Sequence, residues 1–239
     1  MKPTAIISTD LADLIKNLTD LSGNHANQTC NKHATQELCN KLAADAKQGD
    51  LASVTSLIQE YQNNPQKYNS ETFDILVVNA LWRSCENGHL ECAKILQPFS
   101  KGKCRYALHA ACENADREIV EFLIPFQDWS DSFGRKCALF KAVEGGSLDV
   151  VKLILPHVPS KTQRTEALRE ACKSNNQAIF DLLYPLSNPQ SALKYMENRK
   201  TVTEEEKQML KDAITAEQQN KVLSEAVGET GGAKRKMKM

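Results

Sequence analysis

Two residue types that often carry chemistry, His109 and Cys112, lie three positions apart in the segment ALHAACENADREIVEFLIPF, residues 107–126. A thiol beside an imidazole can act as a nucleophile with its general base. The same residue types also pack in protein cores, where a reduced cysteine behaves as a small hydrophobic residue. The first interpretation predicts an enzyme and the second predicts a structural position beneath a binding surface.

A second group of such residues lies near the start of the chain. His25, Cys30, His33 and Cys39 have side chains that suit zinc, but the spacing C-x2-H-x5-C matches none of the usual zinc fingers or knuckles. We predict no metal site here, with a zinc site as the alternative. The phosphate-loop, dinucleotide-binding, serine-hydrolase and zinc-protease motifs are missing from the sequence, so we predict no catalytic residue and no cofactor.

The segment that holds His109 recurs along the chain. Clear copies begin at Ala80, Ala107, Ala138 and Ala167, as ALWRSCENGHLECAKILQPF, ALHAACENADREIVEFLIPF, ALFKAVEGGSLDVVKLILPH and ALREACKSNNQAIFDLLYPL, and a weaker copy begins at Lys41. Each copy has the pattern of two short helices joined by a turn. A recurring segment of this length predicts an array of stacked structural units.

A proline ends the second helix of each clear copy at the same register: Pro98, Pro125, Pro156 and Pro185. Proline cannot continue a helix, because its ring clashes with the preceding turn and it has no backbone N–H. Half of the chain's eight prolines lie in this one register, which supports the repeat independently of the apolar pattern.

The copies resemble ankyrin repeats over about residues 38–198. Leu108, His109 and Ala111 match the centre of the family pattern T-P-L-H-x-A-A, and the pairs Gly88-His89 and Val150-Val151 match its later positions. The Thr-Pro start is replaced in every copy, and the copies are mostly shorter than the family's usual repeat. The resemblance implies an all-α solenoid of about five helix-turn-helix repeats, with a helical cap at each end. Because the copies depart from the family pattern at their start and in their length, we expect short irregular loops between them.

Alignment of the copies places Cys112 at the same position as Ala46, Cys85, Val143 and Cys172. A nucleophile would not be interchangeable with valine, so we interpret this position as packing between neighbouring repeats. His109 aligns in the same way with Trp82, Phe140 and Arg169, and the family resemblance implies a structural hydrogen bond for this histidine.

The two ends of the chain are predicted to differ from the repeats. We predict an N-terminal helix and polar linker as a cap over residues 1–37, the ankyrin-repeat domain over 38–198, a C-terminal helix over 199–227 and a disordered basic tail over 228–239. A partner-binding N-terminal helix is the alternative. The C-terminal helix opens with the capping box Thr203 to Glu206. The basic residues of the tail, which suit nuclear import or an acidic surface, are Lys234, Arg235, Lys236 and Lys238.

Ankyrin stacks usually bind partners on the concave face and on the loops between repeats, and alignment of the copies then gives the partner-binding residues here. On the first helices these are Arg83, Glu86, Asn87, Glu113, Asn114, Lys141, Glu144, Glu170 and Lys173. In the loops they are Arg105, Tyr106, Trp129, Asp131, Phe133 and Arg135. Aromatic residues and arginine are common at interface hot spots. The alternative for Trp129 and Phe133 is that they fold back over the helix ends.

The composition sets limits on the partner and the compartment. Thirty basic residues balance thirty acidic ones, so nucleic acid is not expected. No signal peptide and no run of about 18 apolar residues is evident, so no membrane is expected. Eight cysteines in 239 residues are too few for a disulfide scaffold. We expect a cytoplasmic protein, with nuclear entry or a host-cell cytosol after secretion as alternatives.

These observations favour a monomeric, non-catalytic interaction module, such as a scaffold, adaptor or inhibitor, whose partner is another protein. The alternative is a secreted effector that modifies or redirects a host protein, with an enzymatic site on the repeats or on the N-terminal Cys/His segment.

Overall fold

The fold consists of helices joined by short turns. The computed structural model describes residues 31–236, with side chains for residues 31–224. None of these described residues lies in a strand, and the predicted all-α class is confirmed over this range. The predicted N-terminal helix before residue 23, His25, Cys30 and Lys238 fall outside it.

The chain forms two compact units, Met1–Ala107 and Leu108–Met239, with the division inside α5. The first unit holds a helix over 31–48, then α2 (Leu51–Asn63), α3 (Ser70–Glu86), α4 (Leu90–Leu96), the 3-10 turn η1 (Gln97–Ser100) and the start of α5 (Arg105–Glu113). The second unit continues with α6 (Arg117–Leu123), η2 (Ile124–Phe126), α7 (Ser132–Glu144), α8 (Leu148–Ile154), η3 (Leu155–His157), α9 (Lys161–Lys173), α10 (Gln177–Leu183), η4 (Tyr184–Leu186), α11 (Pro189–Glu197) and α12 (Glu204–Lys236).

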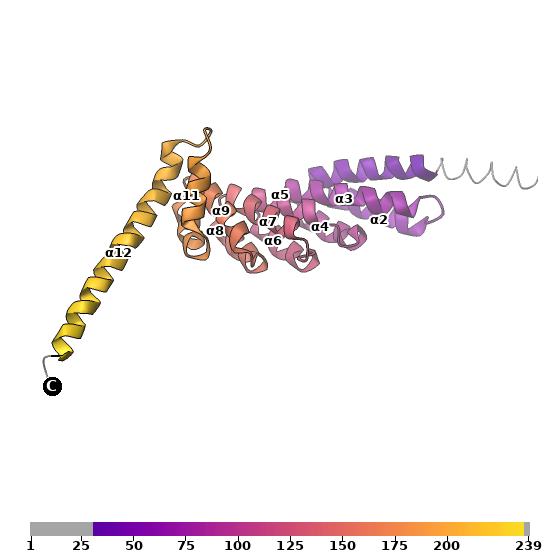
Figure 1. Cartoon of the computed structure of the whole chain (residues 1–239). Helices are drawn as coiled ribbons and strands as arrows, with labels where there is room; N and C mark the ends of the chain where they lie inside the picture. Colours follow the sequence, from indigo (N-terminus) through magenta and orange to yellow (C-terminus); the bar gives the residue numbers. More distant parts are fainter. Residues whose placement is uncertain (1–30, 237–239) are drawn as a thin grey trace, which may run out of the picture. The chain divides into compact units, whose positions relative to one another are not determined.

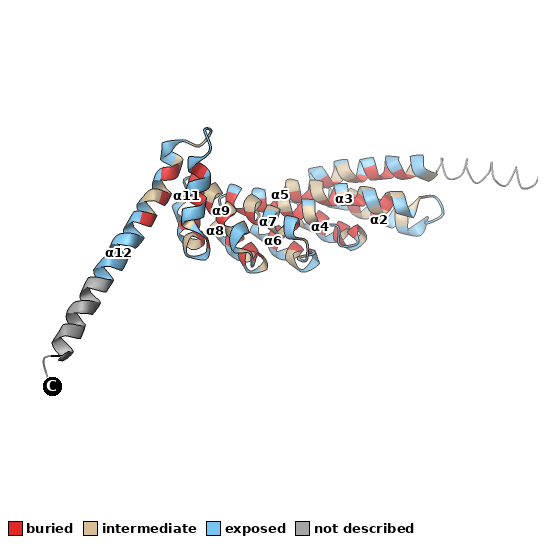
Figure 2. Ribbon diagram, viewed as in Figure 1, coloured by how far each residue is buried: buried red, intermediate tan, exposed pale blue. Residues whose placement is uncertain are grey.

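Helix pairs are the building block of both units. In the second unit, α7, α9 and α11 pack side by side, and α6, α8 and α10 form a second layer against them (Figure 1). In the first unit, α3 packs on α4, and α4 packs on α2. Buried residues lie on the helix sides that face neighbouring helices (Figure 2). At the leucine that opens each copy, the side chain is at most 1% exposed: Leu42, Leu81, Leu108, Leu139 and Leu168.

The turn inside each pair has the same backbone conformation. The second residue before each second helix adopts a left-handed conformation with φ between 49° and 76°, at five positions: Gly49, Gly88, Ala115, Gly146 and Asn175. Glycine adopts this conformation without strain, whereas alanine does so only at a cost of roughly 1–2 kcal/mol. The chain therefore carries a strained backbone at Ala115.

A capping residue follows the left-handed residue in every copy. Side chains at four of these positions accept a hydrogen bond from a backbone N–H in the first turn of the second helix: Asp50, Asp116, Ser147 and Asn176. The fifth, His89, makes no such bond, and its Nε2 lies 3.0 Å from the carbonyl oxygen of Lys47 instead. Polar residues at these positions thus start the second helices.

The prolines end the second helices at the predicted register. Each of the four helices passes directly into a 3-10 turn that carries proline in its first turn. Proline fits the first turn of a helix because its missing N–H would have no intrahelical partner there. The helices therefore end within one turn of the proline.

Both ends of the described chain are more helical than predicted. The segment over 31–37, predicted as part of the polar linker, belongs to the helix over 31–48, because Thr35 and Leu38 on it are buried. The predicted disordered tail also differs from the structure, since α12 continues through residue 228 to Lys236. Glycines in the tail weaken a helix but do not clash with it.

The start of α12 holds it against α11 and α9. The predicted capping box is confirmed: the Thr203 amide donates to the Glu206 carboxylate at 2.6 Å, and the Glu206 amide donates to the Thr203 hydroxyl at 3.3 Å. Leu210 and Ile214 are buried. The Tyr184 hydroxyl also donates to the Glu217 carboxylate at 2.7 Å.

Ala115→Gly should stabilise the protein, because it removes the strain of a left-handed alanine. We expect the free energy of unfolding, measured by urea denaturation, to rise by about 0.5–1 kcal/mol after the entropy of the added glycine is subtracted. The reverse change, Gly146→Ala, should lower it by about 1 kcal/mol.

Ala178→Gly is the matched control, since Ala178 is an exposed residue within α10. Glycine should lower stability there by up to about 1 kcal/mol. Equal destabilisation by Ala115→Gly and Ala178→Gly would show that the turn gains nothing from glycine.

Candidate interaction surface

The His109 and Cys112 pair is part of the packing. Cys112 is fully buried, and burial raises the pKa of its thiol well above the usual range. Burial also raises the pKa of Cys172 to about 12 and that of Cys104 to about 11. His109 Nε2 lies 3.3 Å from the carbonyl oxygen of Gly134, which confirms a structural hydrogen bond for this histidine. A thiol in this setting stays protonated near neutral pH and is a poor nucleophile.

The N-terminal Cys/His segment is described only from residue 31 onward. Within it, His33 is exposed and pairs with Glu37 at 3.2 Å. Cys39, on the same helix, is buried, and burial raises the pKa of its thiol to about 12. The two side chains therefore point into different environments. Among the described residues, no group of three or more His, Cys, Asp or Glu side chains is arranged to hold a metal ion.

Ion pairs tie the predicted surface residues of α5 and α7 together in the second unit. Lys141 Nζ lies 3.0 Å from a carboxylate oxygen of Glu113 and 2.8 Å from one of Glu144. Glu113, Asn114 and Glu144 are exposed, and Lys141 is half-buried. Lys141 is thus held between two carboxylates, which fixes the positions of charges from adjacent repeats.

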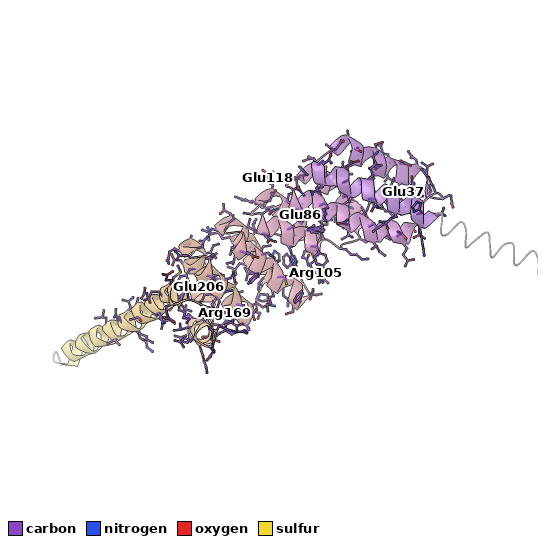
Figure 3. The ribbon with its side chains drawn as sticks, turned by 90° about the horizontal axis from the view of Figure 1, so that it is seen from above. Glu37, Glu86, Arg105, Glu118, Arg169 and Glu206 are labelled. Carbon is purple, nitrogen blue, oxygen red and sulfur yellow. The ribbon has the colours of Figure 1, made fainter. Side chains whose placement is uncertain are left out.

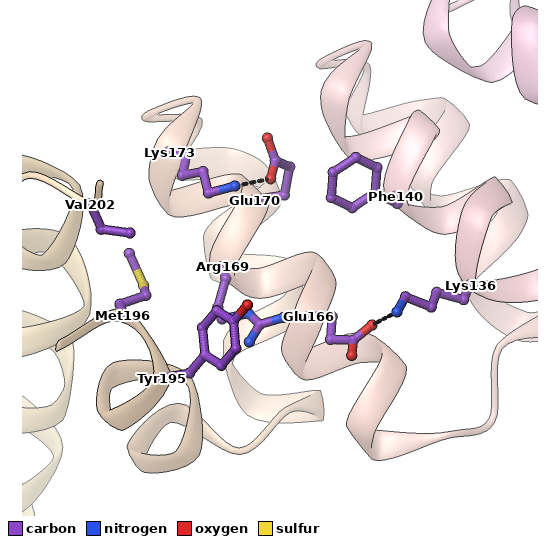
Figure 4. A pocket seen from close by; sticks show the side chains of 9 residues that line it. All are labelled: Lys136, Phe140, Glu166, Arg169, Glu170, Lys173, Tyr195, Met196 and Val202. Carbon is purple, nitrogen blue, oxygen red and sulfur yellow. Dashed lines mark hydrogen bonds and ion pairs between the residues drawn. The ribbon is translucent and has the colours of Figure 1, made fainter. Parts of the chain in front are cut away.

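On α9, the predicted residues Glu170 and Lys173 form an ion pair at 2.8 Å and line a pocket (Figure 4). The pocket has a volume of about 220 Å³. It lies in the second unit, and its lining comes from α7, α9, α11 and the segment before α12: Lys136, Phe140, Glu166, Arg169, Glu170, Lys173, Tyr195, Met196 and Val202.

In the first unit, the predicted residues on α3 form a small cluster of their own. Arg83 pairs with Glu86 at 2.9 Å, and its guanidinium lies 4.2 Å from the ring centroid of Trp82. Asn87 is exposed beside them. Arg105 and Tyr106, which were predicted to lie in a loop, form the start of α5 instead. Arg105 is half-buried and Tyr106 is 65% exposed. Figure 3 shows charged side chains along the surfaces of both units, among them Glu86 and Arg105.

The loop before α7 and the first turn of α7 use most of their predicted contact residues for local structure. Trp129 is half-buried, donates from Nε1 to the Ile124 carbonyl at 3.1 Å and stacks on His157 with 4.3 Å between ring centroids. Arg135 donates to the carbonyls of Trp129 and Ser130. Trp129 was predicted either to contact a partner or to fold back over the helix ends, and these contacts agree with the second interpretation.

Asp131 and Phe133, at the start of α7, differ in their roles. Asp131 is the N-cap of α7 and accepts hydrogen bonds from the amides of Phe133 and Gly134 at 3.0 and 3.1 Å. Phe133 itself is 63% exposed. Phe133 and Arg135, which were predicted to lie in a loop, therefore belong to α7, and Phe133 contacts solvent from the first turn of this helix.

Sequence reasoning assigned Phe140 and Arg169 to a structural position and did not single out Tyr195. In the structure the Arg169 guanidinium lies 3.6 Å from the ring centroid of Tyr195, and both line the pocket with Phe140. The aligned copies hold His109, Phe140 and Arg169 at one position. This change of residue type was the signal in the sequence that could have pointed to a binding site, because a purely structural position would keep side chains of similar chemistry.

Within residues 31–236, no helix combines the length and the apolar character needed to cross a bilayer.

Alkylation by iodoacetamide should distinguish the buried thiols from the half-buried Cys137. At pH 7.5 we expect Cys137 to be modified at least about ten-fold faster than Cys112, because alkylation requires an accessible thiolate. Peptide mapping by mass spectrometry resolves each cysteine, and urea-unfolded protein is the control in which the rates become equal. A Cys112 that reacts as fast as Cys137 in the folded protein would restore the nucleophile hypothesis.

The Trp129–His157 stack should weaken in acid. Burial lowers the pKa of His157 below its usual value of about 6.5. The folded protein therefore binds fewer protons at this site than the unfolded chain does, and stability should fall as the pH drops below about 6.5.

A Trp82→Phe background leaves Trp129 as the chain's one tryptophan, so its fluorescence reports on the stack during urea unfolding. His157→Phe in that background keeps an aromatic partner that cannot titrate. The loss of stability between pH 7 and 5 should be smaller in the double variant. An identical pH dependence in both proteins would remove His157 from this effect.

Comparison with known proteins agrees with the repeat pattern. Two overlapping segments, residues 41–131 and 108–193, match the family described as ankyrin repeats (3 copies). Searches of curated proteins and of solved structures each gave no match. Ankyrin repeats are generally protein–protein interaction modules and typically non-catalytic. Because the match spans most of the chain and the described helices form the corresponding pairs, this protein belongs to the ankyrin-repeat family.

Proposed function

We propose that the chain is a non-catalytic interaction module that binds a partner protein through the first-helix surface and loops of its repeats. One observation carries the proposal: exposed charged side chains of adjacent repeats are already held by one another, as Lys141 is held by Glu113 and Glu144. Side chains that are ordered before binding lose less conformational entropy when a partner docks. Such a surface suits a scaffold, an adaptor or an inhibitor.

The charges on this surface support specificity for one partner. Acidic Glu113 and Glu144 flank basic Lys141 on the surface of the second unit. Alternating charge selects a partner with the opposite pattern, since a wrong register brings like charges together. The exposed Phe133 in the first turn of α7 adds apolar area that a partner can bury.

The effector-enzyme alternative has less support from the described residues. An enzyme that used a cysteine of the repeats as its nucleophile would need an accessible thiolate, whereas burial keeps Cys112 and Cys172 protonated. We also propose a reducing, cytoplasm-like compartment, because the seven described cysteines carry thiols rather than disulfides. Intact-mass measurement of alkylated protein from its native source tests the compartment, and a mass that shows disulfides would contradict it.

The double variant Glu144→Ala, Lys173→Ala tests the surface. Both residues are exposed on first helices of the second unit. Partners captured by cross-linking and identified by mass spectrometry would be purified, and their affinity measured by calorimetry. We expect the variant to bind at least about ten-fold more weakly, a loss of about 1.4 kcal/mol.

Arg117→Ala, Glu121→Ala is the matched control, because these residues form an exposed ion pair at 2.8 Å on α6, a second helix. It should change the affinity less than about two-fold, since exposed pairs contribute little. Circular dichroism and urea unfolding establish that both variants stay folded. If the α6 variant loses the partner and the first-helix variant keeps it, the proposed surface is wrong.

A further inference from the structure

The pocket in the second unit holds an arginine whose hydrogen-bonding groups engage no residue in the described part of the chain. The Arg169 guanidinium lies 3.6 Å from the ring centroid of Tyr195, and the guanidinium of Arg199 lies 4.9 Å from the same ring. Among the described residues, no hydrogen bond or ion pair engages Arg169. Stacking on an aromatic ring orients a guanidinium while its N–H groups, which lie in the plane, stay available to an acceptor.

The neighbouring charges of the pocket are already paired. Lys136 Nζ lies 2.7 Å from Glu166, and Lys173 Nζ lies 2.8 Å from Glu170 (Figure 4). Each of these two pairs is neutral, so Arg169 gives the residues that line the pocket one net positive charge. A monoanion balances that charge. A phosphate dianion would exceed the single positive charge of the lining.

The rest of the lining is apolar. Phe140 and Val202 are half-buried, Met196 is buried, and Tyr195 is 43% exposed. A volume of about 220 Å³ corresponds to roughly seven water molecules and lies below the roughly 300–1,000 Å³ of small-molecule and cofactor sites. The pocket is therefore sized for one or two side chains.

We propose that this pocket binds a carboxylate that stands beside an aromatic or branched apolar side chain on the partner protein. The carboxylate, from Asp, Glu or a chain terminus, accepts two hydrogen bonds from Arg169, and the apolar group lies against Phe140 and Val202. Paired hydrogen bonds between a guanidinium and a carboxylate are strong and directional. This inference rests on the proposed interaction function and names the chemistry that the surface recognises.

N-acetyl-L-phenylalanine is the probe, because it carries both a carboxylate and an aromatic ring. Titration into the ¹⁵N-labelled full chain should shift the Nε–Hε signal of Arg169 and the backbone amides of α9 and α11 saturably. We expect a dissociation constant of about 1–10 mM, as suits one anchoring group. N-acetyl-L-phenylalanine amide and acetate, which each lack one of the two groups, should bind at least about five-fold more weakly.

Three variants separate Arg169 from general charge. Arg169→Gln should abolish the saturable shift, and Arg169→Lys should weaken it because an ammonium lacks the planar fork. Lys152→Gln removes a positive charge from an exposed position on α8, and it should leave the affinity unchanged. Heteronuclear spectra of the free variants establish that each one is folded.

Several results would overturn the proposal. Equal binding of the amide would show that the carboxylate is not recognised. Tighter binding of inorganic phosphate than of N-acetyl-L-phenylalanine would show that the pocket prefers another anion. A shift retained in Arg169→Gln, or no saturable shift, would exclude this pocket.

The failure of this inference differs from a failure of the proposed function. A captured partner that depends on Glu144 and Lys173 but binds Arg169→Gln as tightly as the wild type would leave the interaction surface standing and remove the pocket. If the probe binds through Arg169 and no partner protein is captured, the pocket chemistry stands and the interaction function is the proposal that fails.

Discussion

Each repeat must reverse the direction of its chain within two or three residues, and the rest of the structure depends on how it does so. A left-handed residue follows the first helix, and the next residue is the N-cap of the second helix. The amide of that second residue donates back to the first helix, as from Asp116 to Ala111 at 2.9 Å and from Asn176 to Ala171 at 3.1 Å. These bonds satisfy carbonyls at the end of a helix that would otherwise lack partners.

A fixed turn gives adjacent repeats the same register, and this register places the surface. Because the opening leucine of each copy is buried, the residues that follow it at constant offsets reach the same side of every first helix. Lys141 can then bridge Glu113 on the neighbouring helix and Glu144 on its own. In the same way α9 and α11 bring Arg169 onto Tyr195. Variation on a constant scaffold is how repeat proteins acquire distinct binding surfaces.

Several features of the chain could be predicted because they recur. The packing role of Cys112 followed from its exchange with Val143 in an aligned copy, and burial confirms it. The capping box of α12 is a local pattern and formed as predicted. The loop before α7 occurs once, so no copy could tell whether Trp129 faces solvent. The Trp129 ring stacks on His157, which lies 28 positions away in sequence, and that contact depends on packing.

The amino-acid sequence by itself determined the helix pairs, their turns, their ends at proline and the family, because these depend on short-range backbone preferences repeated at constant spacing. It also placed the charged residues on the first helices. Only the tertiary structure decided which of those residues act together. Arg169, Phe140 and Tyr195 come from three helices of the second unit, and their shared pocket exists because helix packing brings those helices side by side. Distances between side chains of different helices are set by packing of the core, which no local pattern encodes.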